Sequence, residues 1–220
     1  MAYGLLVKNS SGYIQIDDNY SNYTLIASGS VTINASYEDS IRIATISFPS
    51  QAFPVSVCIG NTGSAFVACV SRTSTSVGLV ASATVTISYR IYGLISVNPG
   101  TTSGYGLIVK NGSGEVVFNS NLPYMRIGQI TTSTVGNATL PTVTHGYGAN
   151  FVDITNTGSG IYLFIAQYIE ENSYLQGIGI RVANGSWTYG KVYVRAFVGL
   201  TGAGGGAYPN RPVQAMVLAA

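Results

Sequence analysis

Side chains that could carry out acid–base or nucleophilic chemistry are few in this chain. Its 220 residues include one histidine, His145, and two cysteines. A hydrolytic triad needs a base beside an activated nucleophile, and no Gly-X-Ser-X-Gly turn is present to supply that nucleophile. A lone histidine without a second ligand at suitable spacing also makes no zinc site. We therefore expect His145 to be a loop residue with neither a catalytic nor a metal-binding role.

Acidic residues occur as adjacent pairs, at Asp17-Asp18, Glu38-Asp39 and Glu170-Glu171. Glycosidase carboxylates must flank one bond, whereas neighbouring residues on a strand point to opposite faces. The pairs also lack the regular ligand spacing of a calcium loop. The glycine-rich residues 202–206 are not followed by Lys-Ser/Thr, which excludes a phosphate-binding P-loop. The sequence thus predicts a protein that is not an enzyme and that uses no metal or other cofactor.

The elements that must position these residues are duplicated. Residues 3–12, Tyr-Gly-Leu-Leu-Val-Lys-Asn-Ser-Ser-Gly, match residues 105–114, Tyr-Gly-Leu-Ile-Val-Lys-Asn-Gly-Ser-Gly, at eight of ten positions with an offset of 102. Asn-Thr-Gly-Ser occurs at 61–64 and again at 156–159, and Arg90-Ile91-Tyr92 is similar to Arg195-Ala196-Phe197. A period of about one hundred residues fits a complete small domain copied once.

Alternation of apolar and polar residues dominates both copies, and helical periodicity is almost absent. Residues 84–92 place Val85, Ile87, Tyr89 and Ile91 on one face, and residues 191–198 repeat the pattern. Each copy opens with two short strands joined by Asn-X-Ser-Gly, whose glycine accepts the positive φ that closes a hairpin. We predict an all-β protein with two tandem antiparallel β-sandwich domains of the same fold and a flexible C-terminal tail.

Composition shifts set the predicted boundaries. The first sandwich is expected at 1–98, a linker at 99–104, the second sandwich at 105–200, and a glycine-rich hinge with an apolar tail at 201–220. Two interpretations of the tail carry about equal weight: it folds back onto its own domain, or it docks into a neighbouring subunit as an added strand. Its candidate assembly residues are Tyr208, Val213, Met216, Val217 and Leu218.

Cys58 and Cys69 flank the first Asn-Thr-Gly-Ser turn. Alignment of the two turns places Asp153 and Phe164 at the corresponding positions of the second copy. The fold therefore does not require a disulfide, and we predict two buried thiols.

Charge is sparse. Only 8% of the residues are charged and the formal net charge is +2. No basic stripe is present, so we expect no nucleic-acid partner. No signal-peptide pattern and no long apolar run is found, so we expect synthesis in a cytoplasm and no membrane insertion. Weak electrostatic repulsion suits permanent assembly, including a homo-oligomer.

Tyrosine is abundant, with 16 residues. Aromatic rings in loops suit the recognition of a glycan or a host receptor, whereas the alternative is ordinary packing on a sheet. The candidate contact residues are Tyr20, Tyr23, Tyr37, Tyr147, Tyr168, Tyr174 and Trp187.

The opening residues Tyr3-Gly4-Leu5, with the Asn9-Ser10-Ser11-Gly12 turn, resemble the start of small tail-associated virion proteins of tailed bacteriophages. The resemblance implies a virion component without enzymatic activity, encoded near tail fibre or tail tip genes. Our first hypothesis is a structural protein of the tail tip or fibre that assembles with other tail proteins and resides in the virion. The second is a receptor-binding or carbohydrate-binding module at the distal end of the tail.

Overall fold

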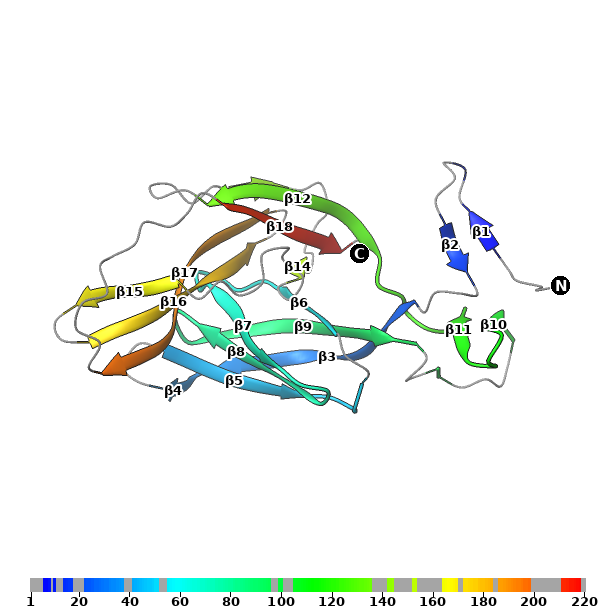
Figure 1. Ribbon diagram of the computed structural model, residues 1–220, viewed down its shortest axis with the longest axis horizontal. Coiled ribbons are helices and arrows are strands. Elements are labelled where there is room, and N and C mark those ends of the chain that lie inside the picture. The colour runs from blue at the N-terminus through cyan, green and yellow to red at the C-terminus, as the bar shows by residue number, and fades with distance from the viewer. Residues whose placement is uncertain are drawn as a thin grey trace.

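Antiparallel β-sheets make up the fold in the computed structural model (Figure 1). The structure describes residues 6–8, 10, 14–17, 22–37, 41–51, 55–95, 99–100, 105–135, 142–144, 152–153, 164–169, 172–183, 186–198 and 211–218. It describes side chains at residues 10, 22–36, 41–51, 55–95, 99–100, 105–126, 179–182, 186–188 and 190. These residues include no helix, and hence none long and apolar enough to cross a membrane. The predicted all-β class is confirmed for this part of the chain.

Eighteen strands are described, half of them before residue 100 and half after it. The first nine are β1 (Leu6–Lys8), β2 (Ile14–Asp17), β3 (Tyr23–Ile33), β4 (Ala35–Tyr37), β5 (Ile41–Ser47), β6 (Ser56–Gly60), β7 (Val67–Arg72), β8 (Ser76–Ala81) and β9 (Val85–Leu94). The others are β10 (Ile108–Lys110), β11 (Val116–Asn119), β12 (Ile127–Val135), β13 (Thr142–Thr144), β14 (Val152–Asp153), β15 (Phe164–Ile169), β16 (Asn172–Ala183), β17 (Ser186–Val198) and β18 (Arg211–Leu218).

Two large sheets and two small hairpins contain all of these strands. The six-stranded sheet has the order β12-β18-β14-β6-β9-β3. The eight-stranded sheet has the order β13-β17-β16-β7-β8-β5-β4, and β15 pairs with β16 beside this path. The hairpins β1-β2 and β10-β11 lie together beyond one end of the large sheets (Figure 1).

The core lies between the two large sheets. Strand β9 shows how the sequence builds it, because Ile87 and Ile91 are buried while Thr86 and Ser88 are exposed, as the alternation predicts. The same core cluster contains Leu79 from β8 and Trp187 from β17. Strand β6 is buried along its whole length, which is typical of a central strand.

Each large sheet takes strands from both repeats. In the six-stranded sheet, β6 pairs with β14, and in the eight-stranded sheet β7 pairs with β16 at Val67 and Ile180. The expectation of two separate sandwiches divided at 99–104 is therefore not confirmed. The physical reason is that the edges of β6 and β7 supply backbone groups to strands of the other repeat.

The two hairpins have the same register. Each is antiparallel, and the bulge falls at the equivalent place, between Val7 and Lys8 in one and between Val109 and Lys110 in the other. Every pair is shifted by 102 residues: Leu6–Asp17, Val7–Ile16 and Lys8–Ile14 in the first hairpin, and Ile108–Asn119, Val109–Phe118 and Lys110–Val116 in the second.

Strands β3 and β12 share the same offset. The pairing of β3 with β9 shifts register between Leu25 and Ala27, and the pairing of β12 with β18 shifts between Ile127 and Gln129. Because a bulge bends and twists a strand locally, its presence at equivalent residues means that the two strands have the same irregularity. In the second repeat, β18 thus occupies the position that β9 occupies in the first.

The similarity of Arg90-Ile91-Tyr92 to Arg195-Ala196-Phe197 predicts that β9 and β17 are equivalent strands, and this prediction is wrong. Strand β9 lies in the six-stranded sheet between β6 and β3, whereas β17 lies in the eight-stranded sheet between β16 and β13. The short similarity reflects the composition of alternating strands and does not identify a common position.

Candidate functional site

The hairpin β10-β11 is built around the side chain of Asn111. Its Oδ1 accepts hydrogen bonds from the backbone N–H of Ser113 at 3.0 Å and of Glu115 at 2.9 Å. Its Nδ2 donates to Glu115 Oε2 at 2.7 Å. Gly114 completes the turn with a φ of 83°, which favours glycine. The Asn-X-Ser-Gly turn predicted for this hairpin is confirmed.

A short exposed segment, Tyr105-Gly106-Leu107, precedes β10 and is held by its backbone. Leu107 donates its N–H to Ser120 Oγ at 2.9 Å and accepts from the N–H of Ser120 at 2.9 Å. Asn121 Nδ2 donates to the carbonyl of Tyr105 at 3.2 Å. The side chains face outward, since Tyr105 is 101% exposed and Leu107 is 48% exposed. The segment therefore combines a fixed backbone with two unburied apolar side chains.

The base of this hairpin is organised by Asn119, which is completely buried. Its Nδ2 donates to the carbonyl of Pro99 at 2.9 Å, and its Oδ1 accepts from the N–H of Asn121 at 3.0 Å. Tyr124 donates its hydroxyl to the carbonyl of Asn119 at 2.9 Å. Residues from the predicted linker thus pack against the hairpin.

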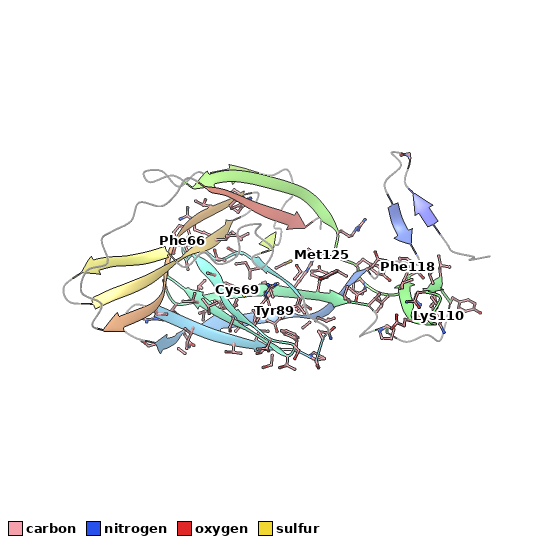
Figure 2. The ribbon with its side chains drawn as sticks, in the orientation of Figure 1. Phe66, Cys69, Tyr89, Lys110, Phe118 and Met125 are labelled. Atoms are coloured by element: carbon pink, nitrogen blue, oxygen red, sulfur yellow. The ribbon has the colours of Figure 1, made fainter. Side chains whose placement is uncertain are left out.

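Aromatic stacking completes this base. The ring of Phe118 stacks on Tyr124 with centroids 5.0 Å apart. Burial raises the pKa of the Tyr124 hydroxyl, and the hydrogen bond to the Asn119 backbone lowers it by a smaller amount. Figure 2 shows Phe118 and Lys110 on the hairpin, and Met125 between the hairpin and the large sheets.

Backbone hydrogen bonds join the hairpin to the first repeat. Leu25 donates its N–H to the carbonyl of Pro123, and Met125 donates to the carbonyl of Tyr23, each at 2.9 Å. Asn22 Nδ2 donates to the carbonyl of Val117 at 3.1 Å. The position of Tyr105 and Leu107 is therefore fixed relative to the body of the molecule.

The first hairpin, β1-β2, repeats the register and the Tyr-Gly-Leu sequence, at Tyr3-Gly4-Leu5. Those three residues lie outside the described part of the chain. The residue after its turn glycine is Tyr13, where the second hairpin has Glu115. The residue that contacts the turn asparagine through a carboxylate in the second hairpin is thus a tyrosine at the equivalent position of the first.

Trp187, a candidate for glycan or receptor contact, is placed in the core. It is completely buried and belongs to the cluster between the two large sheets. Its position on the inward face of β17 removes the ring from the surface, so a role in stacking on an external sugar is not compatible with this structure. The physical reason is that β17 lies in the eight-stranded sheet and this ring packs among buried residues of both large sheets.

The candidate tyrosines are placed unevenly. Tyr23 starts β3, is half-buried and packs against Cys58 and Tyr92. Tyr37 ends β4, and Tyr168 and Tyr174 lie in the paired strands β15 and β16, one residue apart in register. Among the described candidates, only Tyr168 and Tyr174 lie on neighbouring strands. The side chains of Tyr37, Tyr168 and Tyr174 are outside the described part of the structure. Tyr20 and Tyr147 lie outside the described residues, as does His145.

The C-terminal tail enters the fold as β18, with Val213, Met216, Val217 and Leu218 in the strand. It pairs with β12 along eight residues of that strand and with β14 at Val152. This pairing is within one chain, and docking of the tail into another subunit stays a prediction. Tyr208 lies outside the described residues.

Cys58 and Cys69 are buried thiols that form no disulfide, as predicted. Within the described part of the chain, no group of three or more His, Cys, Asp or Glu residues could hold a metal ion. No protein-family model, curated protein or solved structure matches the sequence or the fold.

Tyr105 and Leu107 were missed as site residues by sequence reasoning. The available signal was the repetition itself, because these residues belong to the ten positions at which the two copies agree best. The structure adds that they do not belong to the core. A two-stranded hairpin of this length is marginal by itself in water, and burial of Val109, Val116 and Val117 does not explain the exposed Tyr105 and Leu107.

Proposed function

We propose that this chain is a non-enzymatic structural component of a bacteriophage virion, at the tail tip or tail fibre. It acts by permanent association with other tail proteins and with copies of itself. The observation that carries the proposal is the Tyr105-Gly106-Leu107 segment, whose backbone is hydrogen-bonded while its side chains are exposed. Exposed apolar side chains on a fixed backbone are typical of an interaction surface.

The physical advantage of this segment is preorganisation. Binding costs conformational entropy when loops must be ordered, and the hydrogen bonds from Ser120 and Asn121 have already ordered this one. A tyrosine adds a large contact area with few rotatable bonds. The low charge of the chain, 8% of residues, reduces the desolvation cost of a permanent interface.

We further propose that the two repeats are copies of one folding unit and that the C-terminal segment takes part in assembly. In a single chain β18 fills the space between β12 and β14. The same space accepts the β18 of a second copy if residues 199–210, which include the run Gly204-Gly205-Gly206, connect to a neighbouring molecule.

Virion membership is tested by mass spectrometry of purified particles made by the phage or prophage whose genome encodes the chain. Peptides of this chain should co-purify with the tail proteins at a fixed ratio. Their absence from intact particles would refute the virion assignment.

The role of the hairpin is tested by light scattering of the purified full chain. The wild-type chain should form a defined oligomer, and the double variant Tyr105→Ser/Leu107→Ser should have a lower mass. Lys110→Ser, an exposed change on the same hairpin, is the matched control and should leave the mass unchanged. An oligomer of unaltered mass in the double variant would exclude this surface.

A further inference from the structure

The pairing between the repeats has an internal symmetry. In the six-stranded sheet, Cys58 pairs with Asp153 and Ile59 with Val152, in antiparallel orientation. Cys58 and Asp153 are 95 positions apart, which is also the separation of the two Asn-Thr-Gly-Ser turns that begin at Asn61 and Asn156. Equivalent residues of the two repeats thus lie directly opposite each other.

Antiparallel pairing of equivalent residues has a single simple geometric origin. If a second copy of a strand lies beside the first, with the same residue facing itself and the direction reversed, the two are related by a twofold axis. A plain translation from one domain to the next would give parallel equivalent strands. The β6-β14 pair therefore has the geometry of a homodimer interface.

The outer strands of the same sheet agree with this geometry. From the β6-β14 pair outward, the first repeat contributes β6, β9 and β3, and the second contributes β14, β18 and β12 in the matching order. Strands β3 and β12 carry their bulges at equivalent residues, 102 positions apart. The order and irregularity of three strands are thus repeated about the central pair.

The two edge strands of this sheet, β3 and β12, also come together where they begin. Thr24 forms an antiparallel bridge with Tyr124, immediately before β12 begins. In the same register Tyr23 lies opposite Met125, whose N–H donates to the carbonyl of Tyr23 at 2.9 Å, and these two residues are 102 positions apart, as in the hairpins. Equivalent residues therefore pair at a second place, and each repeat sends its hairpin outward from that place (Figure 1).

We infer that the chain is a covalently joined pseudo-dimer, whose twofold axis passes between Cys58 and Asp153 and between Tyr23 and Met125. The edge of β6 binds a second copy of the same folding unit. In this chain that copy is the second repeat, which binds through β14. The hairpins β1-β2 and β10-β11 then flank the axis as a pair. The partner that fits this end of the molecule is a protein that presents the same binding site twice about a twofold axis.

Distances between spin labels test the axis directly in the full-length chain. Ser30 is opposite Ser88 in β3-β9, and the equivalent pair in β12-β18 is Thr132 with Gln214. A twofold axis exchanges the repeats, so the distance from 30 to 214 must equal the distance from 132 to 88. A translation of one repeat onto the other across the strands of the sheet makes these two distances differ.

Two double-cysteine variants, Ser30→Cys/Gln214→Cys and Thr132→Cys/Ser88→Cys, are spin-labelled and measured by double electron–electron resonance. The native thiols are 0% and 3% exposed and should not react with the label. We expect coincident distance distributions. A second set, joining positions 32 and 212 and positions 134 and 86, provides an independent equality. Separated distributions in either set overturn the inference.

Cross-linking provides a measurement that does not depend on labelling. Asp153→Cys should form a disulfide with Cys58 on mild oxidation, since directly opposed residues of an antiparallel pair can have the required separation. Val152→Cys is the matched control, because successive positions of a strand alternate between its two faces. Failure of Asp153→Cys to cross-link in the folded chain, or equal cross-linking by both variants, would contradict the axis.

The paired hairpins are tested separately, and this test rests on the proposed assembly. Leu5→Ser and Leu107→Ser should lower the mass of the oligomer to the same extent. A clearly unequal effect would contradict the equivalence of the hairpins. A wild-type chain that is monomeric, with equal label distances, would refute the assembly function and leave the axis intact.

Discussion

The two large sheets differ in how faithfully they repeat. In the six-stranded sheet, three strands of each repeat occur in matching order on either side of the β6-β14 pair. In the eight-stranded sheet, the first repeat contributes β7, β8, β5 and β4, and the second contributes β16, β17 and β13 with β15 alongside. The strand order is matched about the central pair in the first sheet and not in the second.

A local difference explains the mismatch in the second sheet. In the first repeat, residues 82–84 connect β8 to β9, which lies in the other sheet. In the second repeat, two residues, Asn184-Gly185, connect β16 to β17, and Ala183 pairs with Ser186. Asn-Gly is the strongest short signal for a hairpin, so β17 stays beside β16. The chain then uses β18 for the position of β9. A duplicated fold can thus keep its strand register while one turn redirects its connectivity.

Removal of β18 should have the largest effect on this comparison. A chain that ends at Asn210 loses every pairing partner of β12 in the six-stranded sheet. We expect the free energy of unfolding to fall by more than about 3 kcal/mol, because the loss exceeds that of one large buried side chain. Urea unfolding followed by circular dichroism measures it. Unchanged stability would show that β18 does not complete the second repeat.

Thr62→Val should have the next largest effect. Thr62 is completely buried, accepts a hydrogen bond on Oγ1 from the N–H of Val182 at 3.0 Å, and donates its own N–H to the carbonyl of Val182 at 2.9 Å. The variant keeps the shape but leaves the N–H of Val182 without its acceptor, which costs about 2 kcal/mol. Thr32→Val is the matched control, since Thr32 is exposed and bonds to Thr86. Equal losses of unfolding free energy in the two variants would show that the contact between Thr62 and Val182 stabilises the fold no more than an exposed hydrogen bond does.

Gly190→Ala tests the packing of the first repeat on β17. A Cβ at residue 190 would lie 2.6 Å from the ring of Phe66, which also lies 5.2 Å from the Arg181 guanidinium. Phe66 is only half-buried and can turn away, so we expect a loss of about 1–2 kcal/mol. Gly112→Ala, with no atom within 4 Å of the added carbon, is the control and should be neutral in the same urea titration. A neutral result at both positions would mean that the ring does not need this contact.

The smallest effect concerns pH. Burial raises the pKa of Tyr92 above its usual value of 10.0, and the hydrogen bond and charge of Arg90 lower it by less. The unfolded chain then loses its proton first, so this group stabilises the fold below pH 10 and that stability is lost as the pH rises through the folded-state pKa. Tyr92→Phe should flatten the fall in unfolding free energy between pH 9 and 11 relative to the wild-type chain, as measured by urea titration across this pH range. Identical slopes would contradict the burial effect.

The sequence predicts the local elements well because their signals are local. A hairpin expected around the Asn61-Thr62-Gly63-Ser64 turn is not formed, because β6 and β7, which flank the turn, lie in different sheets. The alternation in residues 84–92 does correspond to β9, and the Asn-X-Ser-Gly turn corresponds to β10-β11. These features depend on the two-residue period of a strand and on the φ that glycine accepts. The candidate interface could not be predicted from local signals, because the exposure of Tyr105 depends on which other elements of the fold cover it.

The amino-acid sequence by itself determined the all-β class, the repeated motifs and the buried thiols, because alternation, repeated motifs and cysteine context are properties of short segments. Tertiary structure decided that β6 pairs with β14, that β18 takes the place of β9, and that Trp187 is buried. Backbone N–H and C=O groups are the same in every strand, so the sequence does not specify which edges meet. That choice is made by the combined packing of both repeats around one core.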